Sequence, residues 1–99
     1  DMIISSGYNI AAIEVESVLL THPEIAECAV VGLPDEERGM LVCSYIVLKD
    51  KSKAGNDFGK SIQNWFKDVA APYKYPREIR FLDSLPKTET GKIQRYKLK

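Results

Sequence analysis

Apolar side chains between residues 56 and 69 recur with the spacing of one helix face. They are Phe58, Ile62, Trp65, Phe66 and Val69, which follow the pattern i, i+4, i+7, i+8, i+11. The pattern predicts an amphipathic helix, with a side-chain N-cap from Asn56 or Asp57. Because the two large aromatic residues share the stripe with aliphatic ones, we expect Trp65 and Phe66 to pack in the core rather than to stack on nucleic-acid bases.

A shorter helical pattern covers residues 12–21 and ends before Pro23. Its apolar side consists of Val15, Val18, Leu19 and His22. Glu14 and Glu16 lie in the first turn, where the helix dipole favours negative charge. Since side chains two residues apart point to different faces of a helix, these carboxylates make a poor general acid/base pair.

Two apolar runs rich in β-branched residues, 25–31 and 41–48, predict strands of one sheet. The second run has bulky side chains on both faces, which indicates a central strand. Residues 78–82 predict a third strand, and Ser5-Ser6-Gly7 within residues 2–10 predicts a tight hairpin of two short strands. The expected fold is α+β: an N-terminal β-hairpin and a three-stranded, mainly antiparallel sheet packed by two main helices.

Several segments lie outside these elements, and three of them carry an interpretation of their own. The connection 32–39 is charged and rich in turn residues, and we interpret it either as a contact with another domain or as a solvated loop. Residues 71–77 contain two prolines and cannot continue the preceding helix. Residues 96–99 predict the beginning of a short terminal helix.

Charge and cysteine content argue against several classes of function. Lys plus Arg and Asp plus Glu each number 14, so no global field attracts nucleic acid or an anionic membrane. No apolar run approaches the ~20 residues that a membrane span needs. Cys28 and Cys43 lie inside apolar runs and the lone His22 lies outside any ligand pattern, so we expect no metal site and a reduced, cytoplasmic protein.

The clearest candidate for chemistry is the stretch 85–95, LPKTETGKIQR. Its proline, threonines and Gly91 favour a shaped loop that presents the ammonium of Lys92 to an anion. A solvated surface lysine is the alternative interpretation. The sequence disfavours a self-contained phosphate loop, because Pro86 and Ile93 stand where such a loop needs Gly and Ser or Thr.

This stretch resembles the C-terminal lysine motif of the adenylate-forming enzymes, which include acyl-CoA synthetases, peptide-synthetase adenylation domains and luciferases. The opening residues 1–10, DMIISSGYNI, followed by Glu14-Val15-Glu16, resemble the segment with which that family begins its small C-terminal domain. The connector 71–77 is most similar to that of benzoate, 2-aminobenzoate and medium-chain acyl-CoA ligases. The resemblance extends over essentially all 99 residues.

The resemblance implies that residues 1–99 are the mobile C-terminal domain of an acyl-CoA synthetase. The family's hinge residue precedes Asp1, and its ATP phosphate loop, Mg²⁺ environment and acyl pocket belong to an N-terminal domain outside this sequence. That domain, a carboxylic acid, ATP and CoA are the implied partners, and the isolated chain is expected to be inactive.

The resemblance also assigns residues to two half-reactions. Lys92 is the implied catalytic residue for formation of the acyl-adenylate. After the domain rotates, Ser6, Gly7 and Tyr8 line the tunnel for CoA, and Lys67 contacts a CoA phosphate. A plain turn glycine at Gly7 and ordinary solvent exposure of Lys67 are the simpler interpretations, and Asn9 stands where some relatives have a basic residue.

Three other functions stay open at this stage. A peptide-synthetase or luciferase-like enzyme shares the lysine motif. A non-enzymatic interaction module agrees with the neutral charge and small size. A nucleic-acid-binding domain would use Lys74, Arg77, Arg80 and the basic tail, against the zero net charge.

Overall fold

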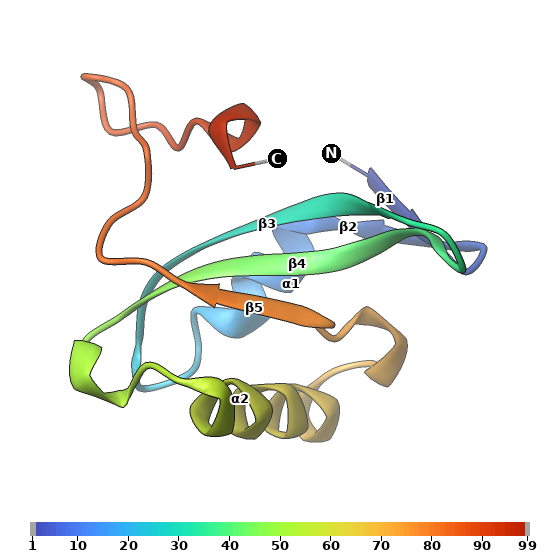
Figure 1. The fold of residues 1–99 in the computed structure, drawn as a ribbon, viewed down its shortest axis with the longest axis horizontal. Coiled ribbons are helices and arrows are strands. Elements are labelled where there is room, and N and C mark those ends of the chain that lie inside the picture. The colour runs from blue at the N-terminus through green and yellow to red at the C-terminus, as the bar shows by residue number, and fades with distance from the viewer. Residues whose placement is uncertain (1, 99) are drawn as a thin grey trace.

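A mixed five-stranded sheet is the centre of the computed structural model, which describes residues 2–98 (Figure 1). The strands are β1 (Met2–Ser5), β2 (Tyr8–Ala11), β3 (Ile25–Asp35), β4 (Gly39–Leu48) and β5 (Glu78–Phe81). The α-helices are α1 (Ala12–Leu19) and α2 (Asn56–Val69), and the short 3-10 helices are η1 (Lys51–Lys53), η2 (Pro72–Lys74) and η3 (Arg95–Lys97). The predicted α+β class with two main helices is confirmed.

Strand β4 is central, as its two-sided apolar pattern predicted. It pairs with β3 along one edge in an antiparallel ladder. On the other edge it meets β1 at the single pair Ser5–Gly39 and β5 over residues 43–46. The hairpin therefore belongs to the same sheet as the other strands. Strand β5 runs parallel to β4, because the connection through α2 crosses back over the sheet before β5 begins.

Strand β3 is longer than predicted, and the expectation of a loop over residues 32–39 was wrong for its first part. Gly32, Leu33 and Pro34 continue the ladder with β4, and the turn is confined to residues 36–38. Proline is tolerated there because β3 is an edge strand that pairs with β4 alone, and Pro34 lies near its end.

Both faces of the sheet are covered, by different parts of the chain. Below the sheet in Figure 1, α1 and α2 pack on it. This core contains Ile3, Ile10, Val15, Leu19, Val30, Ile46, Ile62 and Phe66, among others. Above the sheet lies the C-terminal segment, residues 82–98, whose Leu85, Ile93 and Leu98 cover Val31, Cys43 and Tyr45. The domain is thus a helix layer, a sheet and a covering segment.

The helix boundaries differ from the predictions in three places. Helix α2 has Gly55 at its N-cap and no side-chain cap, so neither Asn56 nor Asp57 caps it. Val69 is 53% exposed, because it lies in the last turn beyond Phe66, where the core ends. Helix α1 ends at Leu19 rather than Thr21, because the amides of Thr21 and His22 bond three residues back in a tighter turn.

The two ends of the chain complete the comparison. The predicted terminal helix is the single turn η3, and Asp1 and Lys99, which belong to the predicted motifs, lie outside the described residues. Within residues 2–98 no helix is long and apolar enough to cross a membrane.

Candidate functional site

Lys92 lies on a tight hairpin that its own backbone and two threonines build. The Thr88 amide donates to the Lys92 carbonyl at 2.8 Å, and the Lys92 amide donates to Thr88 Oγ1 at 3.1 Å. The Gly91 amide closes the turn on the Thr88 carbonyl at 2.9 Å, with a φ of 87° that favours glycine. Thr90 Oγ1 lies 3.0 Å from Thr88 Oγ1. The shaped loop expected from the sequence is present, and we call residues 86–94 the lysine hairpin.

The Lys92 side chain is exposed. Among residues 2–98 its ammonium has no recorded ion pair or hydrogen bond, whereas Lys53, Lys74 and Lys87 each pair with a glutamate. A free ammonium on a shaped turn is suited to an anion supplied from outside this chain.

The base of the lysine hairpin is attached to the sheet. Leu85 is buried against the upper face, and the Gln94 amide donates to the Pro86 carbonyl at 2.9 Å. Lys87 pairs with Glu27 of β3. Arg95, the residue after the hairpin, forms an ion pair with Glu16 of α1. The tip is therefore exposed while its two arms are fixed.

A second predicted site is the turn of the N-terminal hairpin. Ser6 and Gly7 both have positive φ, 51° and 83°, as a two-residue type I′ turn requires. The Ser6 amide donates to the Arg38 carbonyl, and Arg38 Nη1 donates to Ser6 Oγ at 2.9 Å. A Cβ at Gly7 would meet no atom within 4 Å, so the space beside this turn is open. Sequence reasoning did not find the partner Arg38, which is 32 residues away.

The structure links Tyr8 and Lys67 through the segment that follows α2. Tyr8 stacks on Tyr73 with ring centroids 4.4 Å apart, and Lys67 Nζ lies 4.1 Å from the centroid of Tyr75. Arg77 contacts the same tyrosine, with Nη1 donating to its hydroxyl at 2.9 Å. Tyr8 and Lys67, which were predicted from separate parts of the sequence, thus flank one aromatic and basic surface. We call this set of residues the tyrosine surface: Tyr8, Lys67, Tyr73, Tyr75 and Arg77.

The sequence-based candidates for nucleic-acid contacts are already engaged. Lys74 pairs with Glu14 at 2.9 Å, and this bond raises the pKa of Lys74. Arg80 donates to the Tyr45 hydroxyl and pairs with Glu78, contacts that raise its pKa. Arg77 bonds to Tyr75. Lys74 and Arg80 are thus paired with carboxylates, whereas Arg77 contacts only a tyrosine.

Lys92 and the tyrosine surface lie at different ends of the domain. In Figure 1 the lysine hairpin projects at the upper left, and the Ser6–Gly7 turn lies at the right beside the β3–β4 turn. The domain measures 34 × 31 × 21 Å along its principal axes. Residues assigned to the two half-reactions are therefore not brought together within this chain.

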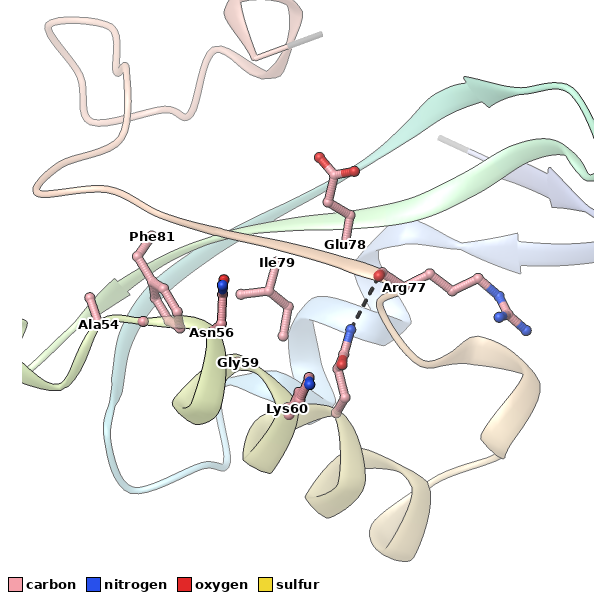
Figure 2. A pocket seen from close by; sticks show the side chains of 10 residues that line it. Ala54, Asn56, Gly59, Lys60, Arg77, Glu78, Ile79 and Phe81 are labelled. Atoms are coloured by element: carbon pink, nitrogen blue, oxygen red, sulfur yellow. Dashed lines mark hydrogen bonds between the residues drawn. The ribbon is translucent and has the colours of Figure 1, made fainter.

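An open groove of about 620 Å³ separates the first half of α2 from β5 (Figure 2). Lys60 and Gln63 line it on the helix side, and Gln63 donates to the Arg77 carbonyl at 3.2 Å, the dashed line in Figure 2. None of the predicted site residues Ser6, Gly7, Tyr8, Lys67 and Lys92 lines this groove.

The thiols and acidic groups offer no second centre within the described part of the chain. Burial raises the pKa of Cys28 to about 12 and that of Cys43 to about 11, so both thiols are protonated at neutral pH. Among residues 2–98 no group of three or more His, Cys, Asp or Glu side chains lies close enough together to hold a metal ion.

Comparisons with known proteins extend these observations. The sequence model described as the AMP-binding enzyme C-terminal domain matches residues 14–92. The uncharacterized acyl-CoA ligase YtcI of Bacillus subtilis (strain 168) is 54% identical over 99 residues, which cover 100% of this chain and 19% of that protein. The mitochondrial acyl-coenzyme A synthetase ACSM3 of Mus musculus is 50% identical over 101 residues, covering 100% of this chain and 17% of that protein.

The fold also matches a solved structure along its whole length. An acyl-CoA synthetase of Brucella canis superimposes with a TM-score of 0.95 at 40% sequence identity, covering 100% of this chain and 18% of that one. The chain thus spans under a fifth of the length of the curated relatives it matches.

Proposed function

The chain belongs to the AMP-binding enzyme C-terminal domain family, and on that basis we propose that it serves as the C-terminal domain of an ATP-dependent carboxylate–CoA ligase. The observation that carries the proposal is the exposed ammonium of Lys92 on a hairpin whose arms are fixed. We assign the activity to the longer parent protein, because this chain spans under a fifth of the length of its relatives and, among residues 2–98, offers Lys92 as its one candidate catalytic group.

In the first half-reaction a carboxylate oxygen attacks the α-phosphorus of ATP, and pyrophosphate leaves. Carboxylate and phosphate repel each other, and negative charge grows on the phosphorus oxygens as the transition state forms. An ammonium between the two groups offsets the repulsion and stabilises the developing charge. We assign this role to Lys92, whose flexible stem lets it follow the charge.

In the second half-reaction the CoA sulfur attacks the acyl carbonyl, the bond to the adenylate oxygen breaks, and AMP leaves. We assign the passage of the CoA arm to Ser6, Gly7 and Tyr8, and a CoA phosphate contact to Lys67. Support comes from the open space beside Gly7 and from the tyrosine surface, where Lys67 and Arg77 place two cations around Tyr75.

The separation of the two sets of residues supports a rotation of the domain between the half-reactions. One docked orientation places the lysine hairpin at the parent's active site, and another places the Ser6–Gly7 turn there. No step is assigned to Mg²⁺ in this chain, and residues 2–98 contain no cluster of three or more His, Cys, Asp or Glu side chains that could hold a metal ion. We propose that the N-terminal domain holds it together with ATP.

The test uses the full-length parent protein. Carboxylate-dependent exchange between ATP and pyrophosphate is measured over a panel of aromatic and medium-chain acids, then repeated with CoA to detect the thioester. Exchange and thioester with one class of acid are the expected result. Exchange without thioester points to peptide-carrier or luciferase-like chemistry, and no exchange with any acid overturns the proposal.

A further inference from the structure

The ion pair between Glu16 and Arg95 joins two parts of the chain that are 79 residues apart. Arg95 donates from Nε to Glu16 Oε2 at 3.0 Å and from Nη2 to the same oxygen at 2.8 Å, and Nη2 also reaches Oε1. Such a two-pronged contact fixes the orientation of the guanidinium as well as its distance. Arg95 is the third residue after Lys92 and directly follows the lysine hairpin, so the contact lies at the base of the hairpin.

The Glu16 carboxylate is itself held in place. It is 7% exposed, and Oε2 accepts a hydrogen bond of 2.8 Å from the Val30 amide of β3. That amide points away from β4 toward α1, and Glu16 supplies the partner that an edge strand otherwise lacks. The guanidinium of Arg95 is therefore bound to a carboxylate whose position is fixed by burial and by its bond to β3.

Besides the ion pair, the downstream arm of the lysine hairpin is held by backbone bonds to the upstream arm, such as Gln94 to Pro86, and by modest packing on the sheet. Ile93 and Leu98 are only half-buried on the sheet, and the Leu98 carbonyl accepts a bond of 2.6 Å from Tyr45. Among the described residues, the core between the helices and the sheet includes none after Phe81. Loss of the ion pair is thus expected to loosen the C-terminal segment while the main core stays intact.

We propose that Glu16 and Arg95 are positioning residues for Lys92, holding the lysine hairpin at the place and angle that adenylation requires; the inference rests on the function proposed above. The geometry favours this role over a purely stabilising one, because a buried ion pair contributes little net stability compared with apolar residues of similar size. A reacting group displaced by about 1 Å can lose roughly 100-fold in rate, so fixing the hairpin has a direct kinetic value.

The test compares Arg95→Gln, Arg95→Lys, Lys92→Ala and the double variant Lys92→Ala/Arg95→Gln in the full-length parent enzyme. We expect Arg95→Gln to slow adenylation by about 10- to 100-fold while thioester formation from preformed acyl-adenylate changes by less than about twofold. Arg95→Lys should be faster than Arg95→Gln but slower than the unchanged enzyme, because lysine keeps the charge but cannot make the two-pronged contact of a guanidinium. The double variant should be no slower than Lys92→Ala alone, since both changes act on one group.

Two outcomes overturn the inference. One is an equal loss in both half-reactions, which indicates general destabilisation, and the other is an additive loss in the double variant. The matched control is Lys53→Gln, which breaks the exposed Lys53–Glu24 pair below the sheet and should leave both rates unchanged. If Lys92→Ala itself keeps full adenylation, the proposed function fails; if it loses adenylation and Arg95→Gln does not, only the positioning role fails.

A second measurement is independent of activity. Limited trypsin digestion of the folded full-length protein, followed by mass spectrometry, reports how often the bond after Lys92 becomes accessible. We expect several-fold faster cleavage there in Glu16→Gln and in Arg95→Lys, both of which keep Lys92 as a trypsin site. Unchanged cleavage after Lys92 in a folded Arg95→Lys protein contradicts the proposed restraint.

Discussion

Lys92 combines a fixed backbone with a free ammonium. Its amide and carbonyl are both bonded to Thr88, and Gly91 supplies the positive φ that turns the chain immediately before it. The side chain can therefore move while its Cα does not. A side chain that moves about a fixed Cα is suited to a reaction in which negative charge develops as the transition state forms.

The first prediction concerns this side chain in the full-length parent. Lys92→Ala should lower the rate of carboxylate-dependent ATP–pyrophosphate exchange by about 100- to 1,000-fold, because one preorganised charge contact is lost from the transition state. Thioester formation from preformed acyl-adenylate should be nearly unchanged. Stopped-flow or quench measurements of the two half-reactions check this, and equal losses in both contradict the assignment.

The second prediction concerns His22, which lies edge-on to Trp65 with ring centroids 4.7 Å apart. Burial lowers the pKa of His22 below 6.5, although Glu24 acts in the opposite direction. Its Nδ1 also accepts a bond of 3.1 Å from the Glu24 amide, which a proton on that atom would break. The unfolded chain therefore takes up the proton first on acidification, so stability falls as pH drops below 6.5.

Urea denaturation of the 99-residue chain between about pH 7.5 and pH 5.5 measures the effect of His22. The control His22→Asn keeps a side-chain acceptor without a titrating ring, and its stability should vary less over this range. An identical pH dependence in both proteins removes His22 as the cause.

At the scale of the elements, α2 shows how one face of a helix sets the core. Ile62 and Phe66 are completely buried, and Phe58 and Trp65 pack beside them. Val69 belongs to the same sequence stripe but lies outside the core. The two ends of one stripe therefore differ in their contribution to stability.

The third prediction compares these two positions. Phe66→Ala should lower the free energy of unfolding by about 3–5 kcal/mol, because it leaves a large cavity under the sheet. Val69→Ala should change it by about 0.5 kcal/mol or less, as for other surface substitutions. Chemical denaturation of both variants measures the difference, and similar losses at the two positions would show that the helix end packs more closely than described.

At the scale of the molecule, the lysine hairpin and the tyrosine surface lie at different ends of the domain. The sheet connects them as a rigid body: β3 and β4 pair from Ile25–Leu48 to Asp35–Gly39. A substitution at one end should therefore affect the half-reaction that uses that end and leave the other unchanged.

The fourth prediction tests this division at the tyrosine surface. Lys67→Ala in the full-length enzyme should raise the KM for CoA by about fivefold, because an exposed charge contact contributes about 1 kcal/mol or less. The rate of ATP–pyrophosphate exchange should not change. Lys60→Ala, an exposed lysine of the same helix that lines the groove, is the matched control and should have no effect on either quantity. An effect of the same size at Lys60 contradicts the assignment of Lys67.

Local patterns in the sequence were sufficient to predict much of the structure of this domain. Helix α2 follows from the spacing of Ile62 and Phe66, and the central position of β4 follows from its two-sided bulk. The Ser6–Gly7 turn follows from the conformational freedom of glycine. Periodicity and turn chemistry act over a few residues, so they can be read without knowing what lies nearby in space. The family followed separately, from the resemblance of the two terminal motifs to those of the adenylate-forming enzymes.

Other features depend on residues far apart in the chain, and the tertiary structure alone decided them. The parallel pairing of β5 and the covering of the upper sheet face by Leu85 arise from the path of the chain after α2. The burial of Glu16 follows from its contacts with Val30 and Arg95, because a carboxylate can be buried only where donors surround it. A helical pattern assigns Glu16 a place along α1 but no partner 79 residues away.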